Sequence, residues 1–389
     1  MHNPSQPQHP QSRRDFLRTA AVGLGATCSL AGCQVVSRSD SARNASRSAV
    51  ERAASNVSIS IEKQTPITHD STRHHAFPGL VRLNDGTLVV TYREGSDHWE
   101  TDDSVVNVTL SSDNGATWSE PKTIHGLNGW ACGSHHGPTQ LSDGSVMAPA
   151  MAIRHVQAGQ RGPYKFRVFN LRSYDNGRTW ERKEIGPQPG YLWQNQYGRI
   201  HEFDGILLQG GGGQTYSDDD FWRTGYFISH DNGETWPEWR TIATHLQDEN
   251  DILVLPDGRF LSMIRSGKET YRSYSADRGK TWSQAEKLDV FGQCPSLLLL
   301  PTGHILFAYR QVRPGAQVGI GLAVSPDYGA TWDEVDPLYV SPTDWDCAYP
   351  SMILDGDNHV LAAYYTAFGG SSSHIELARL RINVGTSPA

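Results

Sequence analysis

An eight-residue pattern, Ser-x-Asp-x-Gly-x-Thr-Trp, occurs five times in this 389-residue chain. Its copies begin at Ser111, Ser173, Ser229, Ser275 and Ser325, so successive copies start 62, 56, 46 and 50 residues apart. In each copy the Asp and Gly favour a tight turn between two strands, and we expect the Trp to pack under that turn. This spacing fits a repeat of four strands and is too long for the repeat of a solenoid.

A second repeat runs in phase with the first and consists of an apolar run, a turn and another apolar run. It occurs six times, with turns at Gly86, Gly144, Gly205, Gly258, Gly303 and Asn358. Asp-Gly between hydrophobic runs is a strong hairpin signal. Six hairpins predict an all-β fold, a six-bladed β-propeller with five copies of the eight-residue box, over residues 57–389. We expect residues 57–62 to join the last blade and cover its open edge.

The first 56 residues are expected to lie outside this fold. Residues 12–17, SRRDFL, form a twin-arginine export motif and precede an apolar stretch, and residues 30–33, LAGC, are typical of a bacterial lipobox. We therefore predict a signal peptide over residues 1–33 and a tether rich in Ser, Ala and Arg over residues 34–56. The protein would be a periplasmic or cell-surface lipoprotein that touches the membrane only through lipid on Cys33.

Composition excludes some classes of partner. The net charge is −8 and no basic stripe interleaved with aromatic residues is present, so nucleic acid is not expected to bind. Three cysteines fall in the predicted propeller, Cys132, Cys294 and Cys347. Nothing near them indicates an activated thiol, and we interpret all three as small packing residues. No cofactor is expected.

Aligning the six blades on their hairpin glycine, or on Asn358 in the last, gives a common register for the innermost strands. The residues nine positions before it are Phe77, His135, Gln196, Glu249, Cys294 and Tyr349. A purely structural strand would repeat Val and Ile at this position. The mixture of polar and reactive side chains indicates a site at the central mouth of the propeller.

Five such boxes on six blades resemble the sialidase superfamily over residues 57–384. The resemblance implies that Tyr349, in the segment AYPS, is a catalytic nucleophile and that Glu249, in DENDILVLPDGR, is its base. It also implies that Arg265 is the middle arginine of a triad that binds a carboxylate. Ala76 and Ala323 stand where the resemblance places the first and third arginines.

The hairpin register offers replacements for these arginines. Arg93, Arg265 and Arg310 each follow the hairpin glycine of their blade by seven residues. Three guanidinium groups on inner strands could converge on one planar anion, or each could pair separately with a carboxylate.

The proton donor is expected from the loop over residues 93–103. Asp97 and Glu100 are the leading candidates, and His98 is a third because its pKa lies near neutrality. The acidic loop could instead be only a solvated rim of the mouth.

His98, His135, His136 and Gln196 are further candidates for contacts with a sugar, with ordinary packing as the alternative. No HExxH or paired CxxC motif is present, so no metal is expected.

Taken together, these features predict an exported glycoside hydrolase that removes a terminal sugar from a glycan or polysaccharide. The sugar is expected to be acidic, with sialic acid as the first choice. Two alternatives stay open: a non-catalytic propeller that binds glycans or assists assembly, and a uronate polysaccharide lyase on the same fold.

Overall fold

The computed structural model describes residues 57–69, 72–98, 101–134, 137–155, 164–216, 222–246, 249–342, 346–369 and 372–385. Every regular element in this part of the chain is a β-strand, so the all-β expectation is confirmed. The described residues include no helix long and apolar enough to cross a membrane. The predicted signal peptide, the tether and Cys33 lie outside the described residues.

The strands form five sheets. The largest combines β2 (His74–Arg82), β3 (Leu88–Gly95), β4 (Val105–Ser111) and β5 (Lys122–His125) with β23 (Ala348–Leu354), β24 (His359–Gly369), β25 (Ser372–Val384) and β1 (Val57–Pro66). The second contains β6 (Ala131–Gly133), β7 (Thr139–Gln140), β8 (Val146–His155), β9 (Tyr164–Ser173) and β10 (Glu181–Gly186).

The other three sheets have four strands each. They are β11 (Tyr191–Phe203), β12 (Ile206–Thr215), β13 (Arg223–Ser229) and β14 (Glu238–Thr244); β15 (Asn250–Val254), β16 (Phe260–Ser266), β17 (Glu269–Ser275) and β18 (Glu286–Lys287); and β19 (Gly292–Leu299), β20 (Ile305–Gln311), β21 (Gly319–Ser325) and β22 (Asp333–Val340).

The count of five sheets differs from the six blades expected. The difference arises in the largest sheet, whose β2–β5 and β23–β25 halves are joined by one parallel pair, His74 with Ser373. Within each half the strands pair antiparallel with their neighbours in the sequence. That single pair therefore merges the four-stranded meander β2–β5 and the three-stranded meander β23–β25, to which β1 is added, into one sheet.

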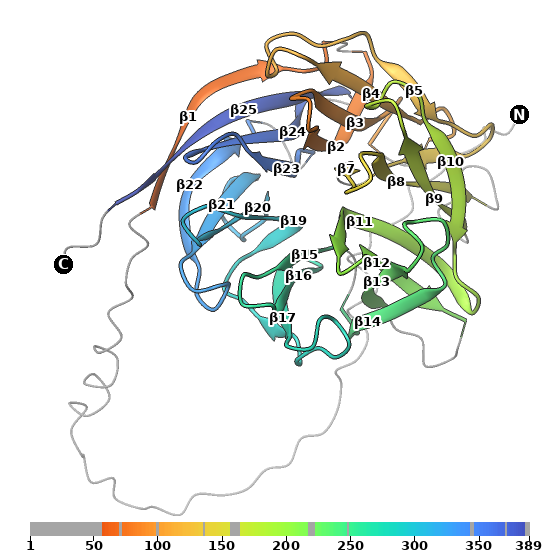
Figure 1. Ribbon diagram of the computed structural model, residues 1–389. Coiled ribbons are helices and arrows are strands. Elements are labelled where there is room, and N and C mark those ends of the chain that lie inside the picture. The colour runs from red at the N-terminus through yellow and green to blue at the C-terminus, as the bar shows by residue number, and fades with distance from the viewer. Residues whose placement is uncertain are drawn as a thin grey trace, which may run out of the picture. The chain divides into compact units, whose positions relative to one another are not determined.

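One strand from each of the six hairpin repeats lies around the middle of the molecule. Figure 1 shows β2, β7, β11, β15, β19 and β23 nearest the centre, with β1, β10, β14 and β22 towards the rim. These inner strands contact one another in succession, and β23 contacts β2. Side chains at the same register position on different inner strands are thereby brought to one central region.

Strand β1 pairs antiparallel with β25, from Val57 opposite Val384 to Pro66 opposite Glu376. This pairing covers the edge of β25, as expected for residues 57–62. The Glu62 carboxylate on β1 lies 2.7 Å from the Arg379 guanidinium and 3.2 Å from the His359 ring. The N-terminal strand is therefore held to the C-terminal strands by backbone pairing and by charge.

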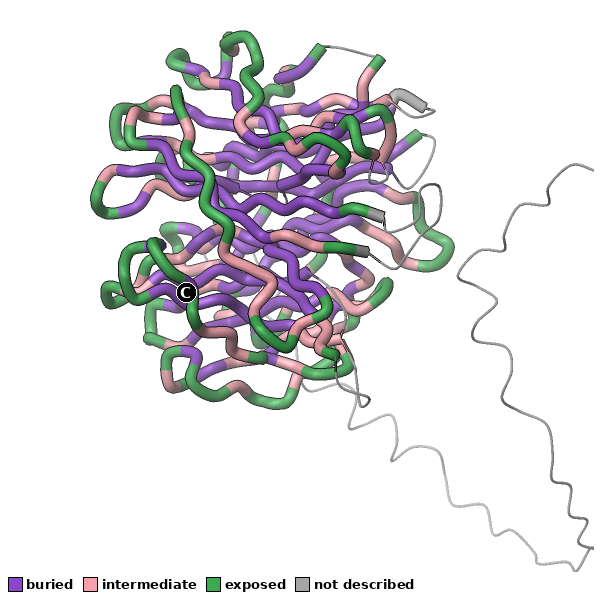
Figure 2. Tube along the Cα trace, turned by 90° about the vertical axis from the view of Figure 1, so that its right-hand side faces the viewer, coloured by how far each residue is buried: buried purple, intermediate pink, exposed green. Residues whose placement is uncertain are grey.

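The five boxes fold into turns with the same hydrogen bonds. In every box the Gly backbone N–H donates to the Ser hydroxyl oxygen at 2.7–2.9 Å. The Thr backbone N–H donates to the Asp carboxylate at 2.8 Å, and the Thr hydroxyl donates to the other carboxylate oxygen. All five Trp side chains pack against hydrophobic clusters, which confirms their structural role. Figure 2 shows the buried residues along the strands and the exposed ones at the turns.

Candidate active site

Three inner strands share an uncommon backbone at the register position nine residues before the hairpin turn. Phe77, Cys294 and Tyr349 have φ values of 56°, 54° and 47°. In each strand the pairing with the next strand shifts at this point, so the ladder is interrupted by a bulge. Left-handed backbone is rare for bulky side chains and concentrates at functional sites, where a bulge re-aims a side chain. The candidate site therefore lies at this level of the inner strands.

Two residues predicted to act together are in direct contact there. The Tyr349 hydroxyl donates a hydrogen bond to the Glu249 carboxylate. The other Glu249 oxygen accepts from the Cys294 backbone N–H at 2.9 Å, which fixes the plane of the carboxylate. Arg265 lies 2.8 Å from the Glu249 oxygen that Tyr349 also contacts. The structure thus assembles a Tyr–Glu–Arg constellation, in which Tyr349 is on β23, Glu249 directly precedes β15 and Arg265 is on β16. The expectation that the three arginines lie on inner strands is wrong, because the hairpin turn places them on the second strands β3, β16 and β20.

The ionisation of this pair follows from its surroundings. Burial alone would raise the pKa of Glu249, but the Arg265 charge and the Tyr349 hydrogen bond lower it to about 2. Burial, together with the negative charge of Glu249, raises the pKa of Tyr349 well above its ordinary value of 10.0. At neutral pH Glu249 is therefore an ionised acceptor and Tyr349 a neutral donor, the protonation states that a base and the nucleophile it activates need.

Arg310 lies against the same tyrosine. Its guanidinium carbon is 5.3 Å from the centre of the Tyr349 ring. Its Nε donates to the Cys347 carbonyl oxygen at 2.8 Å and one terminal nitrogen donates to the Tyr365 hydroxyl at 3.0 Å. Arg265 and Arg310 therefore both approach the Glu249–Tyr349 pair, which is the part of the predicted arginine set that the structure brings together.

Arg93, on β3, makes hydrogen bonds with the loop that follows this strand. Its guanidinium donates to the Asp97 carbonyl oxygen at 2.8 Å and to the Thr101 hydroxyl at 3.4 Å. The Asp97 carboxylate accepts the His98 backbone N–H at 2.6 Å. These bonds shape the loop from which the proton donor was expected. Glu100, the other leading candidate for that role, lies outside the described residues.

A carboxylate that sequence reasoning missed, Asp346, lies beside this loop. One of its oxygens is 2.7 Å from His98 Nδ1 and 2.9 Å from the Tyr365 hydroxyl, which donates to it. The other oxygen is 2.9 Å from His74 Nε2. Burial alone would raise the pKa of Asp346, but hydrogen bonds from the two histidines hold it well below its ordinary value. The His–Asp–His–Tyr network joins β2 and the loop after β3 to β24 and the loop before β23.

One member of this network, Tyr365, could have been predicted from its position relative to the hairpin turn. Tyr365 follows Asn358 by seven residues, the same offset that selected Arg93, Arg265 and Arg310. Asp346 precedes β23 in a loop and has no repeat to mark it. His74 is next to His75 in the sequence. The carboxylate that His74 contacts, Asp346, lies 272 residues away.

The remaining predicted residues lie in different settings. Gln196 is buried and its amide oxygen accepts the Ala150 backbone N–H of β8 at 3.2 Å, a contact between sheets. Cys132, Cys294 and Cys347 are buried free thiols, in agreement with a packing role. His135 and His136 lie outside the described residues.

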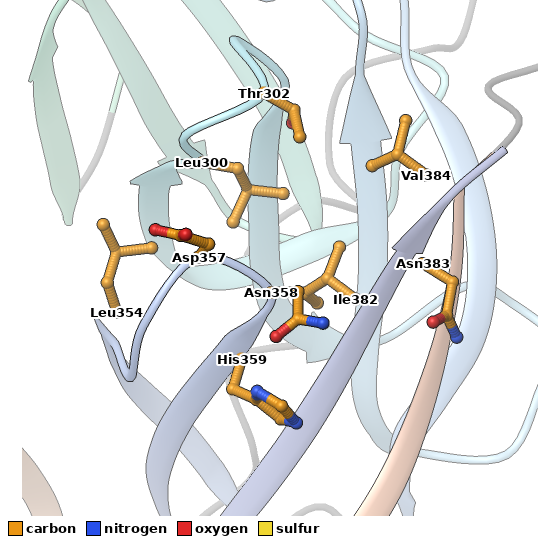
Figure 3. Close-up of a pocket in the computed structure, with 9 residues that line it drawn as sticks. All are labelled: Leu300, Thr302, Leu354, Asp357, Asn358, His359, Ile382, Asn383 and Val384. Atoms are coloured by element: carbon orange, nitrogen blue, oxygen red, sulfur yellow. The ribbon is translucent and has the colours of Figure 1, made fainter. Parts of the chain in front are cut away.

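A hollow of about 340 Å³ opens at the turns of the β19–β20 and β23–β24 hairpins, away from the catalytic candidates. Figure 3 shows Thr302 and Leu300 on one side of it, His359, Asn358 and Asp357 near the β23–β24 turn, and Val384 at the end of β25. None of the predicted site residues lines it. The catalytic candidates lie instead towards the opposite ends of the inner strands.

Comparison with known proteins assigns the sequence to a family. The sequence profile of the family described as "BNR repeat-like domain" matches residues 45–197 and 154–361. A curated sialidase of Paraclostridium sordellii is 26% identical over 192 residues, which are 44% of this chain and 44% of the relative. The match thus spans less than half the length of that relative.

Solved structures share the fold at low sequence identity. A protein of unknown function from Dyadobacter fermentans superposes with a TM-score of 0.72 and 22% identity, covering 84% of this chain and 99% of the other. The intramolecular trans-sialidase of Ruminococcus gnavus superposes with a TM-score of 0.60 and 12% identity, covering 87% and 100%. At these identities the similarity establishes a propeller-type fold and leaves the activity to be argued from the site.

Proposed function

The chain belongs to the BNR repeat-like domain family of the sialidase superfamily, and from that premise we propose that it is a glycoside hydrolase with a tyrosine nucleophile. The observation that carries the proposal is the hydrogen bond from the Tyr349 hydroxyl to the Glu249 carboxylate beside Arg265. A neutral nucleophile with an anionic base suits a substrate whose own negative charge would repel a carboxylate nucleophile.

In the proposed reaction Tyr349 attacks the anomeric carbon while its proton passes to Glu249. The bond to the leaving oxygen breaks as that oxygen takes a proton from a donor in the blade-one loop. Water then attacks the anomeric carbon and gives a proton back to the donor of the blade-one loop, while the bond to the Tyr349 oxygen breaks and that oxygen recovers its proton from Glu249. Because the pKa of Tyr349 is raised far above neutrality, the hydroxyl needs the adjacent carboxylate to become nucleophilic.

We propose that the sugar is acidic, with sialic acid as the first choice. Arg265, which is paired with Glu249, and Arg310, which lies against the Tyr349 ring, concentrate positive charge beside the proposed nucleophile, where a substrate carboxylate would be held. Arg93 is proposed as the third member of the set, from the same register. Glycans or polysaccharides bearing such a terminal residue are the proposed substrates.

The six-bladed count is also a proposal. Its support is the succession of contacts among β2, β7, β11, β15, β19 and β23, which returns from β23 to β2. We further propose twin-arginine export and a lipid anchor on Cys33, on the motifs at residues 12–17 and 30–33. Replacing Cys33→Ser should release the protein from the membrane fraction, and unchanged fractionation would rule out the anchor.

The activity is tested on a panel of aryl glycosides of acidic and neutral sugars together with acidic polysaccharides. The wild-type protein should release the aryl alcohol from an acidic glycoside, and Tyr349→Phe should abolish that release. A product absorbing in the ultraviolet would instead reveal a lyase. If no member of the panel is altered, the hydrolase proposal is wrong.

A further inference from the structure

The Asp346 network assigns a tautomer to His98. The low pKa of Asp346 makes its carboxylate an acceptor only. His98 Nδ1, at 2.7 Å from it, must then carry a hydrogen, as must His74 Nε2 at 2.9 Å. In neutral His98 the remaining nitrogen, Nε2, has a lone pair, and it gains a proton when the ring ionises. A carboxylate that holds Nδ1–H so that Nε2 can exchange a proton is the arrangement of histidines that act in general acid–base catalysis.

His98 and the proposed nucleophile contact the same aromatic side chain. The Phe77 ring is 5.6 Å from the His98 ring and 4.6 Å from the Tyr349 ring, so it touches both. A second connection runs through Tyr365, whose hydroxyl contacts Asp346 and also accepts from Arg310, which stacks on Tyr349. The histidine and the Tyr349–Glu249 pair are therefore two parts of one cluster.

Asp97, the neighbouring candidate, is engaged differently. Its carboxylate accepts the backbone N–H of His98, and its carbonyl oxygen accepts from Arg93. Both bonds lie within the loop and hold His98 in position. In His98 the Nδ1 atom is bonded to a buried carboxylate, which leaves Nε2 to transfer a proton, whereas the Asp97 carboxylate bonds to the backbone of its own loop. His98 is therefore the better candidate for the residue that transfers the proton.

We propose that His98, oriented by Asp346, is the acid and base of the glycosidase reaction, which rests on the hydrolase function proposed above. In the first step protonated His98 gives its Nε2 proton to the leaving oxygen as the glycosidic bond breaks and the Tyr349–carbon bond forms. In the second step neutral His98 takes a proton from water, whose oxygen bonds to the anomeric carbon as the tyrosine leaves. His98 ends protonated again, and Tyr349 recovers its proton from Glu249.

The groups facing His98 set the pH at which it can act. Burial lowers its pKa from the ordinary value of 6.5, hydrogen bonding and charge from Asp346 raise it, and the charges of Arg310 and His74 lower it, with a net decrease. Because the acid must be protonated, kcat/KM should fall as pH rises through this pKa, below 6.5. The optimum of the enzyme should be acidic.

A bound metal is the competing interpretation of the same side chains. His74, His98 and Asp346 offer ligand atoms within 4.8 Å of one another in the described part of the chain. In the structure, however, hydrogen bonds from both rings and from Tyr365 already reach the Asp346 carboxylate. We therefore interpret the cluster as a proton-carrying network, and metal analysis is one arm of the test.

The test compares leaving groups in His98→Gln, with His230→Gln, an exposed histidine on a box turn, as the matched control. The probes are the methyl and 4-nitrophenyl α-glycosides of N-acetylneuraminic acid. Loss of a proton donor should lower kcat/KM for the methyl glycoside by about 10²–10⁴-fold. The 4-nitrophenyl glycoside should lose far less, because nitrophenolate leaves without a proton, and the alkaline limb of its pH profile should disappear.

Azide separates this role from a structural one. An anionic nucleophile needs no base in the second step, so azide should restore turnover of the 4-nitrophenyl glycoside by His98→Gln and give a glycosyl azide. It should not rescue Tyr349→Phe, which lacks the first step. If Asp97 or Glu100 were the acid and base instead, azide would rescue Asp97→Asn or Glu100→Gln rather than His98→Gln. That result would overturn the inference about His98 but would leave the hydrolase function supported.

A measurement without substrate completes the test. Nitrogen NMR of the His98 ring should show the Nδ1–H tautomer and a titration midpoint below 6.5 in the wild type, and Asp346→Asn should lose that tautomer preference. An Nε2–H tautomer, or a stoichiometric metal ion that Asp346→Asn releases, overturns the inference. If the wild type cleaves no glycoside at all, the inference and the proposed function fail together.

Discussion

Tyr349 combines a left-handed backbone, a buried ring and a hydroxyl bonded to a carboxylate. A bulky residue at positive φ costs on the order of 1–3 kcal/mol, and such strain persists where surrounding contacts fix it. Phe77 on one side and Arg310 on the other pack against the Tyr349 ring. These contacts hold the ring in place despite that cost and direct its hydroxyl at Glu249.

Arg265 should set the acid limb of the pH profile. Glu249 must be ionised to accept the Tyr349 proton, and Arg265 is the strongest influence keeping its pKa near 2. In Arg265→Gln burial should dominate and move that pKa towards or above the ordinary 4.5. Activity should then be lost at higher pH as the solution is acidified. The profile of kcat/KM against pH measures this, with Arg265→Lys, which keeps the charge, as the control.

Arg310 should discriminate a carboxylate from its neutral ester. Replacing Arg310→Lys removes a planar, bidentate donor while retaining a charge. A charge-assisted contact is worth roughly 1.5–3 kcal/mol, so kcat/KM for the 4-nitrophenyl glycoside of N-acetylneuraminic acid should fall about tenfold to a hundredfold. The methyl ester of the same glycoside should change little between the two proteins. An equal loss on both substrates would show that Arg310 only supports Tyr349 and Tyr365.

At the scale of elements, the repeated hairpin is the feature of the sequence from which most of the fold and part of the candidate site could be predicted. Side chains alternate with period two along a strand and the turn fixes the register, so an offset from one glycine locates residues on all the inner strands. Glu249 and Tyr349 are 100 residues apart, yet this offset and the segments around them are enough to pair them.

The bulges and the Asp346 network could not be predicted in the same way. A bulge at Phe77 or Cys294 depends on the packing of neighbouring strands and leaves no mark in the repeat. Asp346 lies in a loop, and its partners come from β2, β24 and the blade-one loop. Contacts between a loop and strands distant in the sequence do not follow the repeat, so the repeat cannot predict them.

The box turn allows a test of element stability. Ser275 is buried, and its hydroxyl accepts the Gly279 N–H at 2.7 Å and donates to Asp277 at 2.8 Å. Ser275→Ala leaves the N–H of Gly279 without that acceptor, which should lower the free energy of unfolding by about 1–3 kcal/mol. Lys280→Ala, at an exposed position of the same box, should leave it nearly unchanged. Chemical denaturation of the two variants measures the difference, and equal stability would show that the hydroxyl is dispensable.

At the scale of the whole molecule, the pairing of β1 with β25 joins the first and the last strands that the structure describes. Val57 of β1 is buried in the cluster that contains Leu380 and Ile382 of β25. Glu62 faces Arg379, Arg381 and His359. These contacts connect strands from opposite ends of the sequence, so they act on the assembly of the fold and not on any one hairpin.

Removing β1 should therefore destabilise the molecule as a unit. A chain beginning at residue 67 loses the burial of Val57, worth about 1.5–3 kcal/mol, and exposes the backbone edge of β25 to pairing with other chains. We expect a lower melting temperature and concentration-dependent aggregation, measured by calorimetry and light scattering. A chain beginning at residue 57 keeps the whole of β1 and serves as the matched control. If both truncations melt alike and stay monodisperse, β25 does not need its partner, and the fold is closed by the contacts of the inner strands alone.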